Sequence, residues 1–269
     1  MNLTRRRFLN GLLATPFMPS ALARQPGLRF RVVPEGWGAA QPREVEAVLR
    51  SASSLLTPWF PRLQPEPFVV MFNKDGPIVH YKRNALGEIV MMLSARDHFW
   101  CRYAYQFCHE LTHILCGFQD IPYKNNLWFE ETLCTTASLF VLRRLTPHWT
   151  TTPPFPDWQP YAPEFARYAS GIITRHAFPS ESNLREFFQK NRTHLQLTPR
   201  DRPLNTTMAV ALLDAFEHSP ESWESITWLN SHPPRQEISL ETHLAIWRNA
   251  APPRHRPFIS EIQRRFGAG

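Results

Sequence analysis

The sequence has few cysteines and no long apolar run after its first residues. Its four cysteines form no CxxC motif, which weakens both a zinc-ribbon and a thioredoxin-like interpretation. No stretch beyond the N-terminus reaches the roughly 18 consecutive apolar residues that a membrane-spanning helix needs. We therefore expect no stable membrane insertion once any targeting segment has been removed.

Basic residues are also too few and too dispersed to indicate a nucleic-acid partner. The formal net charge of +7 falls to +4 without residues 1–23, because that segment contains three arginines and no acidic residue. The remaining charge is spread along the chain, and no basic run is interleaved with aromatic residues. We expect no nucleic acid among the partners of this protein.

The first 23 residues have the pattern of an export signal. A basic patch at residues 5–7 precedes an apolar stretch at 8–18, and the small residues Ala21 and Ala23 end the segment as a signal peptidase requires. Residues 4–9 also resemble the twin-arginine signal of bacteria, and the short apolar stretch favours that route over an ordinary secretory signal. The expected location is therefore the periplasm or the surrounding medium.

An oxidising compartment would permit a disulfide, and two states of the cysteines remain open. Cys101 and Cys108 lie too far apart along one expected helix to join each other. Any bridge would therefore connect two helices, with Cys134 as the expected partner. Buried free thiols, for these residues and for Cys116, are the equal alternative.

Strand and helix patterns alternate in the first part of the remaining chain. The apolar pattern predicts a helix over residues 42–56 and strands at 28–35, 67–72, 77–82 and 88–94. Asp97 is expected to cap a helix that runs from His98 to about Cys116. A second helix, apolar nearly all round and hence buried, is expected from about Asn126 to Leu145.

Proline then interrupts this pattern. Six of the 17 residues from 147 to 163 are proline, which indicates a long irregular connection, and the chain beyond has helical patterns to its end. We predict an α+β fold, with a mixed α/β subdomain over residues 24–146 and an all-helical subdomain over 164–269. A cleft is expected between the two.

The stretch His109-Glu110-Leu111-Thr112-His113 is the clearest chemical signal. On a helix, residues four apart are separated by about 6 Å along the axis and about 40° around it, so both imidazoles can bind one metal ion. Glu110 lies about 100° round from His109, too far for a third ligand but suitably placed to take a proton from a catalytic water. The alternative interpretation is a chance motif in a helical domain without metal.

The sequence that follows gives the motif a context. "HELTH" together with "WFEETLC" resembles the gluzincin metallopeptidases of the peptidase MA type, in which a helix with HExxH precedes one with a tryptophan-x-x-glutamate pattern. The resemblance spans residues 109–171 and implies a zincin-like fold. It also implies one zinc ion held by His109, His113 and Glu131, with Glu110 as general base. The neighbouring Glu130 is the rival third ligand, and helical phase does not separate the two.

A short stretch further on carries a second part of the resemblance. In gluzincins similar to aminopeptidase N, the tyrosine of a Tyr-x-x-Gly stretch stabilises the oxyanion of the tetrahedral intermediate. The resemblance implies that role for Tyr168, with Tyr161 and His176 as substitutes. The Gly-x-Met-Glu-Asn strand that anchors a free amine in those aminopeptidases is missing, which argues against assuming aminopeptidase activity.

These implications describe an exported zinc metallopeptidase, a hydrolase that acts on a peptide or protein substrate. The strand at 88–94 is expected to form a cleft edge to which an extended peptide adds. A catalytically inactive gluzincin-like binding or scaffold protein of the periplasm is the alternative. The intact ligands and base argue against that alternative, because a relative that has lost activity usually lacks one of them.

Overall fold

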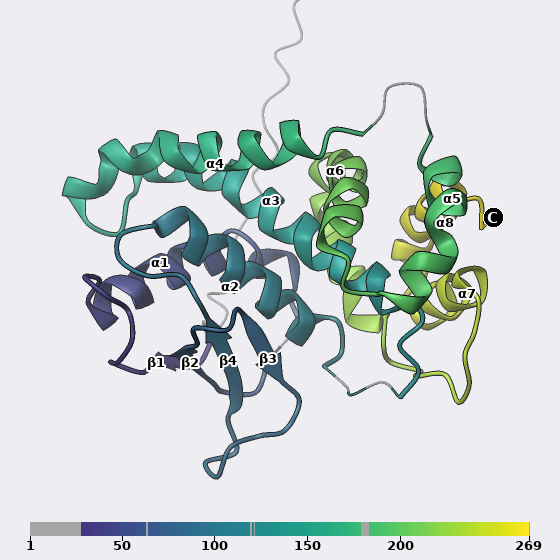
Figure 1. Ribbon diagram of the computed structural model, residues 1–269, viewed down its shortest axis with the longest axis horizontal. Coiled ribbons are helices and arrows are strands. Elements are labelled where there is room, and N and C mark those ends of the chain that lie inside the picture. Colours follow the sequence, from purple (N-terminus) through teal and green to yellow (C-terminus); the bar gives the residue numbers. More distant parts are fainter. Residues whose placement is uncertain (1–27, 63, 119, 121, 179–182, 269) are drawn as a thin grey trace, which may run out of the picture.

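The computed structural model describes residues 28–62, 64–118, 120, 122–178 and 183–268. Residues 1–23, which the sequence predicts to be an export signal, lie outside this part of the chain. The described chain is α+β, as predicted, with a small mixed sheet followed by many helices (Figure 1). Within it, no helix combines the length and the apolar character that a membrane crossing needs.

The described strands form one sheet in the order β1-β2-β4-β3. β1 (Phe30–Val32), β2 (Phe68–Phe72) and β4 (Ile89–Leu93) are parallel, and β3 (Ile78–His80) runs antiparallel to β4. The expectation that residues 88–94 offer a free edge is wrong, because β4 is hydrogen-bonded to a strand on each side. Among the described strands, the edge next to β4 belongs to β3.

Two helices cover one face of this sheet (Figure 1). α1 (Pro42–Ser54) buries the apolar stripe that its helical spacing predicts, and it packs against α2 (Trp100–Leu115). A short 3₁₀ turn, η1 (Thr57–Trp59), follows α1. Because α2 lies between the sheet and the remaining helices, its residues are buried on most sides.

Asp97 does not cap α2, contrary to expectation. Its backbone has a φ of 55°, and its Oδ1 accepts a hydrogen bond of 2.8 Å from the amide of Ala39. The carboxylate therefore ties the segment before α1 to the segment before α2. Helix α2 begins after Phe99 instead.

Helix α3 (Leu127–Thr151) is longer than the sequence indicates and includes Pro147. The expectation of an irregular connection over 147–163 is wrong, since η2 (Pro156–Tyr161) and α4 (Ala162–Arg175) take up most of the rest. Pro147 removes the hydrogen bond to the carbonyl of Arg143. Both residues are exposed, so water can replace that bond, while buried Leu145 and Trp149 keep the last turn against the core.

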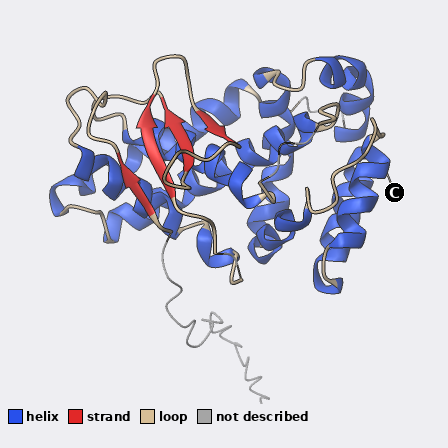
Figure 2. Cartoon of the chain, turned by 90° about the horizontal axis from the view of Figure 1, so that it is seen from below, coloured by secondary structure: helices blue, strands red, loops and turns tan. Residues whose placement is uncertain are grey.

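The remaining helices lie at the opposite end of the molecule from the sheet (Figure 2). One continuous core of buried apolar residues extends from the strands to the last helix. In chain order these elements are α5 (Leu184–Leu197), α6 (Arg202–His218), η3 (Pro220–Trp228), α7 (Leu240–Ala250), η4 (Pro253–His255) and α8 (Arg256–Phe266).

Trp149 gives a test of the extended α3. It is fully buried, its Nε1 donates a hydrogen bond of 2.7 Å to Ser51 Oγ, and its ring meets Phe165 edge to face. We expect Trp149→Ala to lower the free energy of unfolding by about 3–5 kcal/mol, measured by denaturant titration. Leu197→Ala, at an exposed helical position, should change it by less than about 0.5 kcal/mol. Equal losses in the two variants would contradict the packing described here.

Candidate metal centre

Helix α2 presents its histidines to α3 near its own C-terminal end. His109 and His113 lie one turn apart, and their ring centroids are 5.2 Å apart. The helix stops just after His113, because Gly117 takes a left-handed backbone conformation with φ 81°. The chain then turns back into α3, which packs along α2 more extensively than any other element does.

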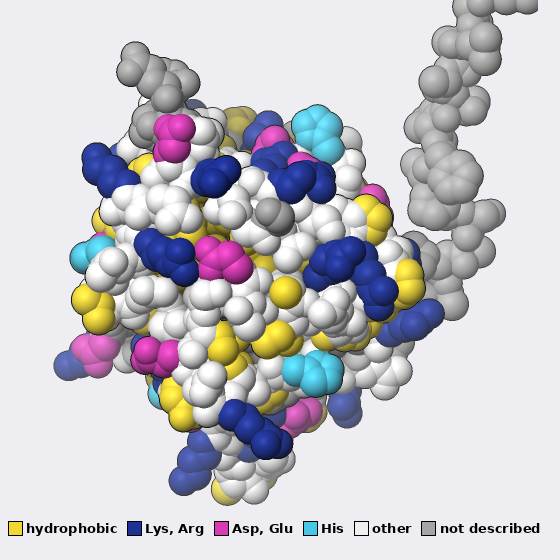
Figure 3. All heavy atoms as spheres, turned by 90° about the vertical axis from the view of Figure 1, so that its right-hand side faces the viewer, with side chains coloured by type: hydrophobic (Ala, Val, Ile, Leu, Met, Phe, Trp, Pro, Cys, Tyr) yellow, Lys and Arg dark blue, Asp and Glu magenta, His cyan; other side chains and the backbone are white. Residues whose placement is uncertain are grey.

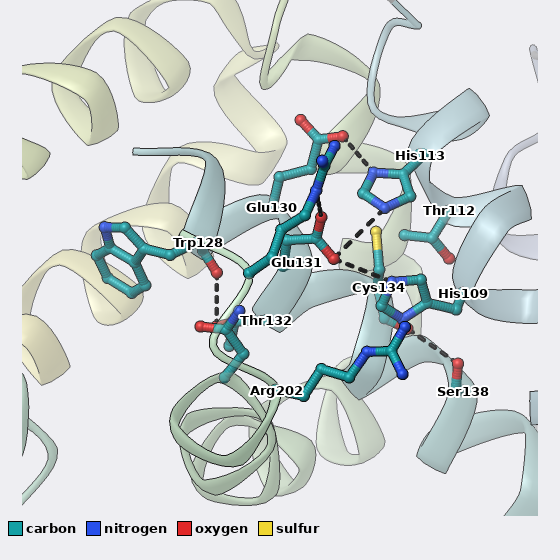
Figure 4. Close-up of polar contacts among 12 residues, drawn as sticks. His109, Thr112, His113, Trp128, Glu130, Glu131, Thr132, Cys134, Ser138 and Arg202 are labelled. Carbon is teal, nitrogen blue, oxygen red and sulfur yellow. Dashed lines mark hydrogen bonds and ion pairs between the residues drawn. The ribbon is translucent and has the colours of Figure 1, made fainter. Parts of the chain in front are cut away.

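The start of α3 is held by aromatic side chains from the C-terminal helices. Trp128 stacks on Phe188 of α5 at a centroid distance of 5.2 Å, and Phe129 meets Phe266 of α8 edge to face at 5.7 Å. Both α3 residues are fully buried. With these two side chains fixed on one side, the following Glu130 and Glu131 face α2 on the other (Figure 4).

Glu131 lies between the two histidines. Its Oε2 is 3.1 Å from His109 Nε2 and 3.7 Å from His113 Nε2 (Figure 4). Two donor atoms about 2 Å from one tetrahedral metal ion lie roughly 3.3 Å apart. Both distances are compatible with ligands of a single ion, and they place Glu131, the third ligand that the sequence predicts, against both histidines.

Glu130 takes a different position. Its Oε1 accepts a hydrogen bond of 2.6 Å from Nδ1 of His113, and its Oε2 accepts one of 2.7 Å from Asn230 Nδ2. A carboxylate on the far nitrogen of a ligating imidazole fixes the ring and leaves Nε2 free to face the metal. The geometry therefore favours Glu131 over Glu130 for the third-ligand role and gives Glu130 an orienting role.

Cys134 joins this group, which the sequence did not indicate. One donor atom each from His109, His113 and Cys134 lie within 4.8 Å of one another, close enough to hold a metal ion. Figure 4 shows the thiol pointing between the two rings. Cys134 is one helical turn after Glu131, so helical phase could have suggested it. In this structure all four cysteines are buried free thiols, and Cys134 is in hydrogen-bonding contact with Cys116.

The histidines and carboxylates of this group shift one another's pKa values. Burial alone would lower the pKa of His113, but hydrogen bonds with Glu130 and Glu131 raise that pKa well above its usual value. Burial likewise opposes ionisation of Glu131, yet hydrogen bonds with the two histidines lower its pKa. Arg200 Nε also donates to Glu131 Oε1 at 3.2 Å. The site thus holds carboxylate charge that a bound cation could neutralise in place of the proton on His113.

Glu110 stands apart from these contacts. The residue is 4% exposed, and no hydrogen bond joins its carboxylate to any residue that the structure describes. Burial raises its pKa, and nearby His109 and His113 only partly offset that effect. A buried carboxylate without a hydrogen-bond partner costs stability, and such groups are found preferentially at functional sites.

The predicted oxyanion donor is not brought into contact with the histidines. Tyr168, in α4, meets the ring of Tyr105 edge to face at 6.0 Å, and Tyr105 lies one turn before His109 on α2. The hydroxyl of Tyr161 is committed to Cys101 at the first turn of α2, so it is a poor substitute. The role of Tyr168 stays a prediction, and Tyr105 is a candidate that sequence reasoning missed.

His176, the other substitute, lies at the C-terminal cap of α4. No described contact joins it to either histidine of the candidate centre. Its place in the fold therefore gives it no advantage over Tyr105 as a donor.

Glu130→Gln tests the orienting contact. The amide keeps the shape of the side chain but loses the charge that favours the His113 Nδ1 proton, so we expect metal affinity to fall by about 10–100-fold. Competition with a chromogenic chelator measures this affinity. Glu237→Gln, on an exposed loop, removes the same charge and should leave the affinity unchanged. Equal affinities in the two variants would contradict a role of Glu130 in metal binding.

Known proteins add nothing to this geometry. No protein-family model matches the sequence, and neither a curated protein nor a solved structure matches it. The resemblance to gluzincins therefore rests only on the motif residues themselves. The structure adds to the candidate centre by placing Glu131 against both histidines and by bringing His109, His113 and Cys134 close enough to hold a metal ion.

Proposed function

We propose that the protein is an exported zinc metallopeptidase of the gluzincin type. The observation that carries this proposal is Glu110, a buried residue beside His109, His113 and Glu131 whose carboxylate has no hydrogen-bond partner among the described residues. A purely structural metal site has no use for such a group. A metal-dependent hydrolase requires a general base at this position.

The donor types suit zinc, which prefers imidazole nitrogen, thiolate sulfur and carboxylate oxygen. In this proposal His109, His113 and Glu131 hold the ion, and Glu130 orients His113. Zinc, when bound, supplies a Lewis acid that polarises a carbonyl and lowers the pKa of water. Three protein ligands would leave one position open, as catalytic zinc sites do.

Glu110 performs the proton transfers. Its carboxylate accepts a proton from the attacking water and returns the proton to the leaving amine of the peptide. Because burial raises the pKa of Glu110, the carboxyl group is a stronger base than an exposed glutamate. It is therefore better suited than an exposed glutamate to take up the proton of the attacking water.

The sheet supports a zincin-like layout. β3 is an antiparallel edge strand, and the side chains of Ile78 and His80 are exposed along it. Tyr81, directly after β3, lies near enough to Glu130 for the two to interact electrostatically. An extended peptide that added to the edge of β3 would therefore pass the candidate metal centre.

Cys134 favours a second candidate function. If the thiol ionised and completed a four-ligand set with both histidines and Glu131, the site would be closed, as structural zinc sites are. The protein would then be an inactive gluzincin-like scaffold. Burial raises the pKa of the Cys134 thiol, which opposes ionisation and favours the open site.

Cobalt(II) substitution separates the two candidates. If the site is open, the cobalt-loaded protein should lack the near-ultraviolet charge-transfer absorption of a cobalt–thiolate bond, because Cys134 is then not a ligand. Cys134→Ser should therefore keep both the cobalt stoichiometry and the spectrum. A thiolate band that disappears in this variant would identify a closed site and support the scaffold.

Two isosteric substitutions test the peptidase mechanism. Glu110→Gln should retain about one zinc per chain, because this side chain is not a ligand, but it should abolish hydrolysis, because an amide cannot accept the proton. Glu131→Gln should weaken zinc binding as well, because it replaces an anionic ligand with a neutral one. Zinc content and hydrolysis of a peptide library measure the two effects. Wild-type turnover by Glu110→Gln would exclude this mechanism.

The oxyanion donor needs its own pair of variants. If Tyr168 has this role, Tyr168→Phe should lower kcat by about 10²–10³-fold with little change in KM. Tyr105→Phe, at the neighbouring ring on α2, is the comparison. A loss of kcat confined to Tyr105→Phe would transfer the role to Tyr105, and full activity of both would exclude a tyrosine donor on this face.

A further inference from the structure

A small cavity lies on the side of Glu130 away from the histidines. It has a volume of about 30 Å³, and its lining includes Tyr81, Lys124, Glu130, Arg200, Asn230 and His243. These residues come from the end of β3, the connection before α3, α3 itself, the segment before α6, the segment after η3, and α7. Glu130 and Arg200 belong to both the cavity and the candidate metal centre, so the cavity adjoins the place where a peptide would be cleaved.

The one acidic residue in the cavity is already compensated. Each oxygen of Glu130 accepts a hydrogen bond, one from His113 and one from Asn230. Both carboxylate oxygens of Glu130 are therefore already hydrogen-bonded within the protein. A ligand in the cavity would meet the remaining groups instead.

Those groups include donors with free hydrogen-bonding capacity. Arg200 uses Nε for Glu131 and offers its two terminal nitrogens, and its side chain is 66% exposed toward the solvent. His243 is 8% exposed, and its ring has no hydrogen bond to a described residue. Burial lowers its pKa to about 4, so the neutral ring retains one N–H. The hydroxyl of Tyr81 is likewise free of hydrogen bonds within the described chain, whereas Lys124 is already paired with Asp120, its Nζ 3.4 Å from Oδ1.

The size of the cavity limits what it can bind. A volume of about 30 Å³ suffices for about two water molecules, whereas an aromatic ring needs a cavity of roughly 150 Å³. Two oxygen atoms of one carboxylate would fill it. A wider hollow that shares Tyr123 and Pro234 with the cavity contains Arg235 and no acidic residue.

Resting on the proposed peptidase function, we infer that this cavity binds a carboxylate of the peptide substrate next to the scissile bond, with Arg200 and His243 as its donors. The carboxylate belongs to an aspartate or glutamate side chain or to a free C-terminus. Charged side chains of both signs are dispersed over the face formed by the C-terminal helices (Figure 3). The preference is therefore local to the cavity and does not come from a broad basic surface.

Matched peptides test the preference. One arm uses C-terminally amidated peptides with Asp or Glu, or with their amides Asn or Gln, on either side of the cleaved bond. The other arm compares a free C-terminus with an amidated one. We expect kcat/KM to be at least about tenfold higher for the carboxylate in one arm, which identifies its source. Hydrolysis without preference in either arm would overturn this inference and leave the peptidase function intact.

Two arginine variants assign the preference to the cavity. Arg200→Gln should reduce the carboxylate-to-amide ratio of kcat/KM about tenfold. Arg43→Gln makes the same change in charge at an exposed position of α1, at a side chain that does not line the cavity, and should preserve the ratio. Because Arg200 contacts Glu131, zinc content is measured for both variants, and the ratio is compared per zinc bound. An unchanged ratio in Arg200→Gln would overturn the assignment.

A binding measurement separates this inference from the proposed function. Zinc-loaded Glu110→Gln is titrated with the same peptides in a calorimeter. Tighter binding of the carboxylate peptides would support the cavity assignment, whether or not the wild type cleaves them. Failure of the wild type to cleave any peptide would contradict only the peptidase function. Equal binding of carboxylate and amide peptides would overturn the cavity assignment.

Discussion

The close packing of α3 on α2 is the contact on which the candidate centre depends. At the crossing, Ser138 Oγ donates a hydrogen bond of 2.8 Å to the backbone carbonyl of Tyr105, so the two helix backbones approach closely. Fully buried Ala137 and Ser138 leave room for that approach. One turn toward the start of α3, the same approach brings Cys134 and Glu131 opposite the histidines. The small side chains of Ala137 and Ser138 at this crossing therefore help the donor groups to converge.

Much of the fold could be predicted from the sequence, because it follows from residue patterns within single helices and strands. The strands, α1 and the histidine pair follow from spacing within one element. The extent of α3 could not be predicted, since Pro147 is tolerated only because its side of the helix faces solvent. The identity of the edge strand depends on the order of strands in the sheet, which apolar patterns do not encode. For the same reason the roles of Glu130 and Glu131 were separated only by their three-dimensional contacts.

Glu110 is consistent with a catalytic metal site, whereas Cys134 is consistent with a structural one. A buried base is useful only with an open metal position, and a fourth protein ligand would close that position. Both groups lie within the same two helices, so a single property decides between them, namely whether the thiol keeps its proton. Burial acts on both in the same sense, since it raises the pKa of the carboxyl and that of the thiol. The same apolar surroundings therefore strengthen the base and discourage the extra ligand.

The aromatic anchor at the start of α3 also sets an order of events during synthesis. Phe266 packs against both Trp128 and Phe129, although it follows them by more than a hundred residues. Every group that we propose to hold the metal has been translated long before Phe266 emerges from the ribosome. The contacts of Trp128 and Phe129 with Phe266 can form only afterwards. They link the start of α3, and with it Glu130 and Glu131, to a helix that is distant in the sequence.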